Sequence, residues 1–299
     1  MNTGEAAMKK LFPFLLAALC LGSFCSCGTN ITYKNAEKYS VGGSTVTGVA
    51  RLEIGWLDGS VAIGTHDGEG VIFSETASRE LGDADKLRYW LNGDKLYLQY
   101  ARAGRVNLKN LNKELTVLLP AGTELLSLEI NGVSADIVCG GGGRDFSCRQ
   151  AEIASISGNL SVRLLSSGGT LELESVSGRI TAETVGQFER LKAESTSGDV
   201  RMTASALREF EISTVSGDIE LVLLSGEPRE GQVETVSGVV SLFLPEGIGF
   251  TAKYKTVSGS FRCEHSGTLE TGRIEVGNGA CELKLESVSG DLKIHKTES

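Results

Sequence analysis

A short phrase centred on a Ser-Gly pair recurs along the second half of the chain, and apolar and polar positions alternate on either side of it. From residue 154 onward it reads ASISGNL, ESVSGRI, ESTSGDV, STVSGDI, ETVSGVV, KTVSGSF and ESVSGDL. Its glycines are Gly158, Gly178, Gly198, Gly217, Gly238, Gly259 and Gly290. Successive spacings are 20, 20, 19, 21, 21 and 31, so the period is about twenty and the last interval carries an insertion of roughly ten residues.

The positions after each glycine predict a strand with one buried face. The second and fourth residues after it are mostly apolar, as in Ile219 and Leu221, whereas the residue between them is mostly polar, as in Glu220. This alternation with a period of two is typical of a half-buried strand. We therefore expect Leu221 to point inward between Met202 and Leu242 of the neighbouring repeats.

A second strand precedes each glycine. The fifth residue before it is apolar in every repeat, and the third residue before it is always Ser or Thr. Each repeat thus predicts one coil, meaning two short strands joined at a Ser-Gly corner. Such a coil cannot form a core alone, but stacked copies can, each pairing its backbone with the coils on both sides. We predict an all-β, single-stranded β-solenoid with coils of about twenty residues, right-handed like most connections between parallel strands.

Residues 41–150 predict a diverged start of the same array. Alternating runs include VARLEIGWL, SVAIGT, KLYLQYA and KELTVLLPAG, and turn signals include Asp58-Gly59, Asp67-Gly68 and Asn92-Gly93. The run GGGGR at 140–144 indicates a loop. We expect one solenoid domain over 41–298, with diverged coils at 41–150 and regular repeats at 151–298.

These phrases resemble a known bacterial family. KELTVLLPAG, the repeated TVSGDIELVLL-like phrases and the final GNGACELKLESVSGDLKI are similar to those of the DUF4097 family, whose members are often labelled adhesins or β-strand repeat proteins. The resemblance covers about residues 41–295. It implies a β-solenoid of the cell envelope, sometimes linked with envelope stress, and supplies no catalytic residues.

The amino terminus indicates export. Lys9 and Lys10 precede the apolar run LFPFLLAALCL and the small residues and cysteines of GSFCSCG. This is typical of a secretory signal and is short for a membrane span. We expect a lipoprotein signal at 1–26 that starts at Met8, lipid attachment at Cys27 and a polar tether at 27–40. An ordinary cleaved secretory peptide is the alternative. The predicted location is the cell envelope, anchored to a membrane by lipid.

Charge and composition limit the classes of partner that the protein can bind. The formal charge is -9, which argues against binding of nucleic acid or anionic lipid through bulk electrostatics, because those partners require a basic surface. Glycine occurs 38 times and proline 4 times, in keeping with many tight turns. A solenoid presents long regular surfaces, so we expect a protein or glycan partner in the envelope.

The remaining cysteines are Cys139, Cys148, Cys263 and Cys281, an even number that allows two disulfides in an oxidising compartment. Local pairing would join Cys139 to Cys148 and Cys263 to Cys281. Buried free thiols are the alternative. The spacings of 9 and 18 residues match no zinc motif.

No residue pattern points to catalysis. The three histidines, His66, His265 and His295, are far apart in sequence. The repeated serines of the Ser-Gly pairs favour turn chemistry, because a catalytic serine would occur once. Asp199, Asp218 and Asp291 follow the corner in only three coils, unlike calcium solenoids with an acidic ligand in every turn. We therefore expect no enzyme activity, cofactor or metal.

The function that we expect is an interaction or structural module of the envelope, similar to an adhesin. One alternative is a polysaccharide-active β-helix enzyme, with Arg201 beside Glu220 and Glu183 beside Thr203 on an exposed face. Another is an accessory protein that senses envelope stress. Phe243 and Val222 occupy outward positions of neighbouring coils and suggest an apolar patch.

Overall fold

The computed structural model describes residues 30–297, which are all-β apart from two short 3-10 helices. The described residues fall into two compact units, 30–164 and 165–297. They contain no helix with the length and apolar character that a membrane span requires. Cys27 and the predicted signal lie outside the described residues.

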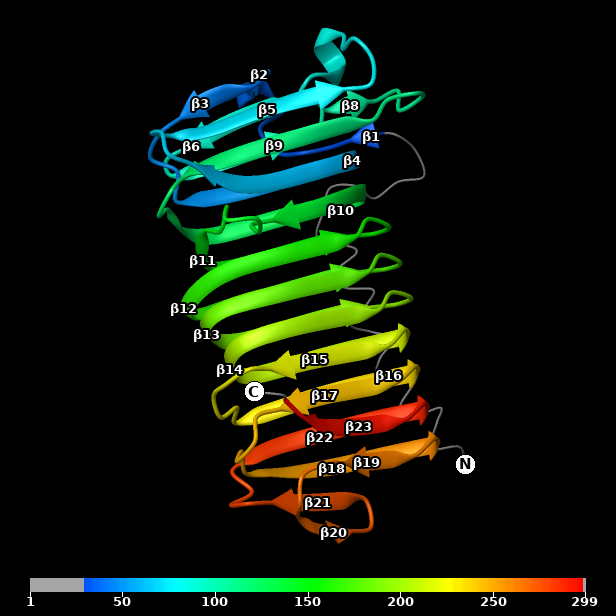
Figure 1. Ribbon diagram of the computed structural model, residues 1–299. Coiled ribbons are helices and arrows are strands. Elements are labelled where there is room, and N and C mark those ends of the chain that lie inside the picture. Colours follow the sequence, from blue (N-terminus) through cyan, green and yellow to red (C-terminus); the bar gives the residue numbers. More distant parts are fainter. Residues whose placement is uncertain (1–29, 298–299) are drawn as a thin grey trace. The chain divides into compact units, whose positions relative to one another are not determined.

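The amino-terminal unit (30–164) is built on long parallel strands (Figure 1). Its core strand β4 pairs with β10 on one side and with β7 and β9 on the other. Apolar side chains align across these pairs, as Leu52 does with Leu96 and Leu128. The elements are β1 (Asn30–Ile31), η1 (Ala36–Lys38), β2 (Ser40–Val41), β3 (Ser44–Val46), β4 (Arg51–His66), β5 (Val71–Ala77), η2 (Asp83–Asp85), β6 (Arg88–Asn92), β7 (Lys95–Gln99), β8 (Gly104–Arg105), β9 (Lys113–Pro120), β10 (Glu124–Cys139), β11 (Ser147–Ser155) and the start of β12 (Leu160–Ser175).

The carboxy-terminal unit (165–297) stacks the Ser-Gly repeats in parallel register. Residues that pair across β13, β14, β15 and β17 are 20, 19 and 21 positions apart, as in Ile180↔Val200, Val200↔Ile219 and Ile219↔Val240. Its strands are β13 (Ile180–Ser195), β14 (Val200–Ser216), β15 (Ile219–Leu223), β16 (Glu230–Ser237), β17 (Val240–Leu244), β18 (Phe250–Ser258), β19 (Phe261–Cys263), β20 (Thr268–Glu270), β21 (Arg273–Val276), β22 (Cys281–Ser289) and β23 (Leu292–Lys296).

The predicted inward and outward positions are confirmed. Leu221 is 1% exposed and lies in register with Met202 on one side and Leu242 on the other. Glu220 is exposed between Arg201 and Ser241. The alternation with a period of two therefore separates core from surface as the sequence indicates.

The order of the last coils differs from the order along the chain. The final coil, β22 and β23, lies between the coil of β16 and β17 and the coil of β18 and β19, as Figure 1 shows for β23. The predicted insertion forms the hairpin of β20 and β21, and β21 pairs antiparallel with β18. After β17 the chain thus leaves one coil position empty and forms β18 and β19 beyond it. The hairpin then covers the outer edge of β18, and β22 and β23 occupy the position that was left empty.

The amino-terminal unit uses the same device. Its first long strand, β4, is flanked by the later strands β7 and β9 on one side and by β10 on the other. The outer edges of β7 and β9 are covered by the antiparallel strands β6 and β5. Covering these edges removes unpaired backbone groups that would recruit other chains.

One local expectation needs correction. Residues 30–40, expected in the polar tether, lie against the unit instead: β1 pairs with β8, and Ile31 is 1% exposed. The reason is that this stretch contains Ile31, Tyr33 and Tyr39, whose apolar parts gain from burial. Of the predicted turn signals, Asp58-Gly59 lies within the strand β4, where Gly59 has a positive φ of 93°, and Asn92-Gly93 connects the antiparallel strands β6 and β7.

Candidate functional site

The serine hydroxyls three residues before the corner glycine are structural in three successive coils. The Oγ atoms of Ser155, Ser175 and Ser195 are buried and accept hydrogen bonds from the backbone N–H of the corner glycine three residues later, at 3.0, 2.8 and 2.9 Å. A hydroxyl that is enclosed and occupied in this way is unsuited to attack a substrate. Each of these serines stands three residues before its corner glycine, and the role in turn chemistry predicted for the serines of the Ser-Gly pairs themselves stays a prediction.

The corner aspartates bind the neighbouring coil. The Oδ1 atoms of Asp199, Asp218 and Asp291 accept hydrogen bonds from the backbone N–H groups of Asp218, Val239 and Ser260, at 3.2, 2.8 and 2.9 Å. Each carboxylate therefore satisfies a main-chain donor at the place where the adjacent strand bends. Over residues 30–297, no group of three or more His, Cys, Asp or Glu side chains is arranged to hold a metal ion.

The histidines have structural partners. His66 accepts a hydrogen bond from Gly68 N–H at 3.1 Å and donates one to the Gly70 carbonyl at 2.9 Å. His265 is buried and donates to the His295 carbonyl at 3.2 Å, which ties the outermost coil to the final coil. His295 itself lies 3.0 Å from a Glu264 carboxylate oxygen and stacks on Phe243.

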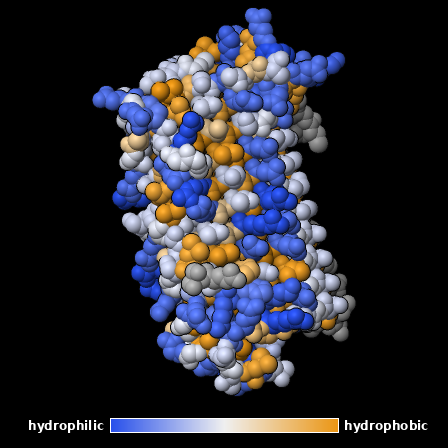
Figure 2. Space-filling model, viewed as in Figure 1, coloured by the Kyte–Doolittle hydropathy of each residue, from blue (hydrophilic) through white to orange (hydrophobic). Residues whose placement is uncertain are grey.

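The outward side chains form regular columns. Arg201 lies in register with Glu220, and Glu183 with Thr203, as the sequence predicts. Val222 lies beside Phe243, and both are half-buried. On the face shown in Figure 2, hydrophobic side chains form separate patches among hydrophilic ones. The sheet surface therefore offers mixed contacts at fixed spacing.

A lysine organises the acidic part of this surface. Lys192 Nζ lies 2.6 Å from Glu172, 3.6 Å from Glu174 and 3.3 Å from Glu194. Burial opposes the charge on Lys192, but the surrounding carboxylates outweigh it and raise its pKa. Burial also raises the pKa of Glu194, which is 5% exposed. We interpret this cluster as an ion-pair network between neighbouring coils.

All four cysteines of the described chain carry free thiols, so neither predicted disulfide is formed in this structure. Cys139, Cys148 and Cys281 are buried and Cys263 is half-buried. Burial raises the pKa of the Cys148 and Cys281 thiols to about 12. Pairing in an oxidising compartment stays a prediction.

A hollow opens in the carboxy-terminal unit where the regular ladder is interrupted. The register between β13 and β14 shifts after Thr184, so that Gln187 pairs with Ala206, 19 positions away. The next strand, β15, ends at Leu223, and the chain crosses the opening as the loop 224–229. The loop is held by hydrogen bonds from Ser225 Oγ to the Ser205 carbonyl, at 2.6 Å, and from Arg229 N–H to the Arg208 carbonyl, at 2.8 Å.

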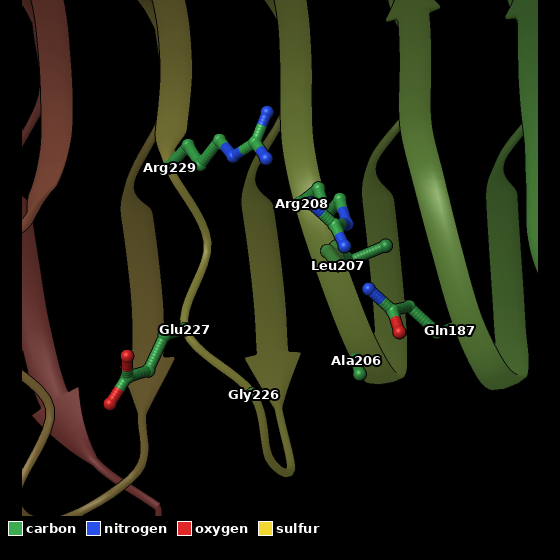
Figure 3. A pocket seen from close by; sticks show the side chains of 7 residues that line it. All are labelled: Gln187, Ala206, Leu207, Arg208, Gly226, Glu227 and Arg229. Carbon is green, nitrogen blue, oxygen red and sulfur yellow. The ribbon is translucent and has the colours of Figure 1, made fainter.

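This β14–β15 pocket has a volume of about 280 Å³. Its lining residues are Gln187, Ala206, Leu207, Arg208, Gly226, Glu227 and Arg229. Figure 3 shows the side chains of Arg229 and Gln187 reaching toward Arg208 from opposite sides, whereas Glu227 points away. Arg208 Nε also lies 3.2 Å from a Glu189 carboxylate oxygen. Guanidinium and amide donors of this kind suit a polar ligand that carries carboxylate or hydroxyl oxygens.

Sequence reasoning missed the pocket, although the signal was present. The spacing of 19 between Gly198 and Gly217 is the shortest of the series, and the missing residue falls where β13 and β14 lose register. Reasoning from the sequence also missed Lys113, which is fully buried and pairs with Glu75 at 2.6 Å. Burial lowers the pKa of Lys113, and its ammonium group lies over the Tyr100 ring at 4.3 Å.

Comparison with known proteins identifies relatives. The family model described as Toastrack DUF4097 matches residues 49–295. No curated protein matches the chain.

Three solved structures are similar to the chain. A "putative cell adhesion protein" from Clostridium sporogenes is 14% identical, with a TM-score of 0.29, covering 87% of this chain and 100% of the other. A "putative lipid binding protein" from Parabacteroides distasonis is 16% identical, with a TM-score of 0.48, covering 87% and 97%. A "putative adhesin" from Parabacteroides merdae is 12% identical, with a TM-score of 0.42, covering 87% and 97%.

Proposed function

Because the chain belongs to the Toastrack DUF4097 family, we propose that it is an interaction module of the bacterial cell envelope, exported and acting in the manner of an adhesin. The proposal includes a right-handed solenoid with coils of about twenty residues. It assigns the protein binding and no catalytic step. Its partner is a protein or glycan of the envelope or of a surface that the envelope meets.

The observation that carries this proposal is the ladder of outward side chains on parallel strands. Thr203, Val222 and Phe243 occupy successive rungs, and each strand between them is hydrogen-bonded to neighbours on both sides. Side chains on such a rigid sheet lose little freedom when a partner binds, which favours affinity. The β14–β15 pocket, in the same unit, adds guanidinium and amide donors.

The pocket supplies a direct test of binding. Beads coated with the exported protein at constant density would be incubated with envelope polysaccharides and with whole cells, and the bound fraction counted. We expect the double variant Arg208→Ala/Arg229→Ala to lose at least about tenfold in binding, since each arginine offers charge-assisted hydrogen bonds. Arg201→Ala/Arg262→Ala, two exposed arginines outside the pocket lining, is the matched control.

The outcomes separate the possible roles. Equal binding by the two double variants would remove the pocket from the proposal, and absence of binding to any cell or polysaccharide would remove the adhesin-like role. Release of new reducing ends from a bound polysaccharide would replace that role with the polysaccharide-active enzyme. Induction of envelope-stress genes on deletion, without loss of adhesion, would favour the sensor.

The anchor is tested separately. If Cys27 is lipidated, Cys27→Ala moves the protein from the detergent-extracted membrane fraction to the soluble exported fraction. Ser26→Ala, which keeps a small residue before the cysteine, should leave the protein in the membrane fraction. Membrane partitioning that is unchanged in Cys27→Ala would contradict lipid attachment at this residue.

A further inference from the structure

The chain is fixed to the amino-terminal unit from Asn30 onward. Asn30 pairs antiparallel with Arg105, and Ile31 with Gly104. The Tyr33 hydroxyl then donates a hydrogen bond to the Ala101 carbonyl at 3.1 Å and accepts one from Ala103 N–H at 3.1 Å. The segment that follows the predicted lipid site is therefore held against β8.

Three exposed cations flank this attachment, and we call them the basic face: Lys34, Arg102 and Arg105. Within residues 30–297, none of the three forms an ion pair. The carboxylates across this end of the unit have ion-pair partners outside the basic face: Asp83, which also attracts Arg102 through space, pairs with Arg88 at 2.9 Å, and Asp85 pairs with Arg79 at 3.0 Å. Glu37, three residues beyond Lys34, is the nearest other carboxylate along the chain. The basic face thus carries net positive charge on a protein of charge -9.

The chain length brings the basic face close to a membrane. Only three residue steps separate Cys27 from Asn30, and three extended residues span at most about 10 Å. A lipid on Cys27 would therefore hold β1 and β8 within about one Debye length of the headgroups, where electrostatic attraction is still felt. Anionic phospholipids supply the complementary charge, and each basic residue near their surface adds attraction.

We propose that the basic face docks on anionic phospholipid headgroups and so orients the amino-terminal unit on the membrane. This inference rests on the proposed function for the lipid anchor, but the surface itself consists entirely of described residues. The occupant is the phosphate layer of the bilayer that holds the anchor. Docking would fix which outward columns of the amino-terminal unit remain available to a partner.

The test uses the exported Cys27→Ala protein, which lacks the lipid, in sedimentation with vesicles. One set contains about one third phosphatidylglycerol in phosphatidylcholine, and the other contains phosphatidylcholine alone. We expect binding to the anionic vesicles only, and loss of that binding as salt rises. The variant Lys34→Glu/Arg102→Glu/Arg105→Glu should bind the anionic vesicles about 100-fold more weakly.

The matched control is Lys253→Glu/Lys255→Glu/Arg262→Glu, three exposed cations of the carboxy-terminal unit. It should bind like the parent, and thermal unfolding would establish that both triple variants are folded. Equal binding by the two triple variants, or equal binding to both vesicle types, would overturn the proposal. Fractionation of the Cys27→Ala protein tests the anchor independently, so failure of the anchor and failure of the basic face give different results.

Discussion

Replacing Leu221 by aspartate places a carboxylate in the centre of an apolar column. Leu221 is 1% exposed between Met202 and Leu242, themselves 2% and 1% exposed. Loss of the leucine side chain removes about 1.5–3 kcal/mol of burial free energy. An aspartate without a partner would have its pKa raised by about 3 units, which costs a further 4 kcal/mol or so near neutral pH. The expected loss is about 5.5–7 kcal/mol, a large fraction of the stability of a typical domain.

The assay is urea unfolding of the protein, with Glu220→Lys as the neighbouring control. Glu220 is exposed, so this substitution should change the free energy of unfolding by at most about 0.5–1 kcal/mol. Hydrogen exchange should show the first loss of protection around residues 200–244 in Leu221→Asp, because stacked coils depend on their nearest neighbours. Equally mild effects of the two substitutions would refute the inward column.

Three further predictions follow from the corners, the thiols and the ion pairs. Gly198→Ala should lower the stability measured by thermal unfolding by several kcal/mol, because its Cβ would lie 1.9 Å from a main-chain oxygen of the preceding corner. Ser197→Ala, on the surface, should lower it by less than about 0.5 kcal/mol. Equal losses in the two variants would contradict the close approach of the backbone at Gly198. Cys281, buried and with its pKa raised to about 12, should resist thiol reagents in the native protein and react only after unfolding; fast native labelling would contradict its burial. Lys192→Met should lower the free energy of unfolding by about 3 kcal/mol at pH 7, because it leaves carboxylates unpaired. The loss should be smaller at pH 4, since the raised pKa of Glu194 means that its protonation favours the folded state as pH falls. Urea unfolding at both pH values measures the loss, and a loss that does not shrink in acid would contradict this prediction.

The pattern along the chain was enough to predict the core positions. Leu160, Ile180 and Val200 stand two residues after their corner glycine, and all are at most 1% exposed. The prediction succeeds because strand alternation and corner chemistry depend on neighbouring residues in the sequence, and the same local pattern occurs in every repeat. The outermost coil is the exception: Tyr254 and Phe261 occupy inward positions but remain half-buried, stacking on each other, because this coil has a neighbouring coil on one side only.

The order of coils could not be predicted in the same way. The coils around Gly259 and Gly290 have the same pattern, so either could stack on the coil around Gly238. The main-chain contacts decide: a Cβ on Gly290 would meet the Gly238 carbonyl oxygen at 1.9 Å, and one on Gly259 would meet that of Gly290 at 2.1 Å. The ten-residue insertion was the feature of the sequence that indicated the changed order. A hairpin long enough to cover the edge of the outermost coil also gives the chain enough length to return to an inner position.

The surface chemistry was harder still. The β14–β15 pocket arises from one residue missing opposite Gly186, a change that leaves the apolar pattern intact. The docking of Ile31 and Tyr33 depends on β8, about seventy positions away along the chain. Contacts at such separations depend on tertiary packing, which a single sequence does not reveal through periodicity.

The stacking order on which the account depends can be measured by disulfide trapping. In a background with the native cysteines replaced by alanine, Ser241→Cys/Lys293→Cys joins residues paired in adjacent parallel strands, about 4.8 Å apart and within disulfide reach. Ser241→Cys/Arg262→Cys joins residues that both flank Lys293, about 10 Å apart and beyond reach. We predict rapid oxidation of the first pair and none of the second. Oxidation of the second pair without the first would mean that the coils stack in chain order, and would contradict the structure proposed for the binding surface.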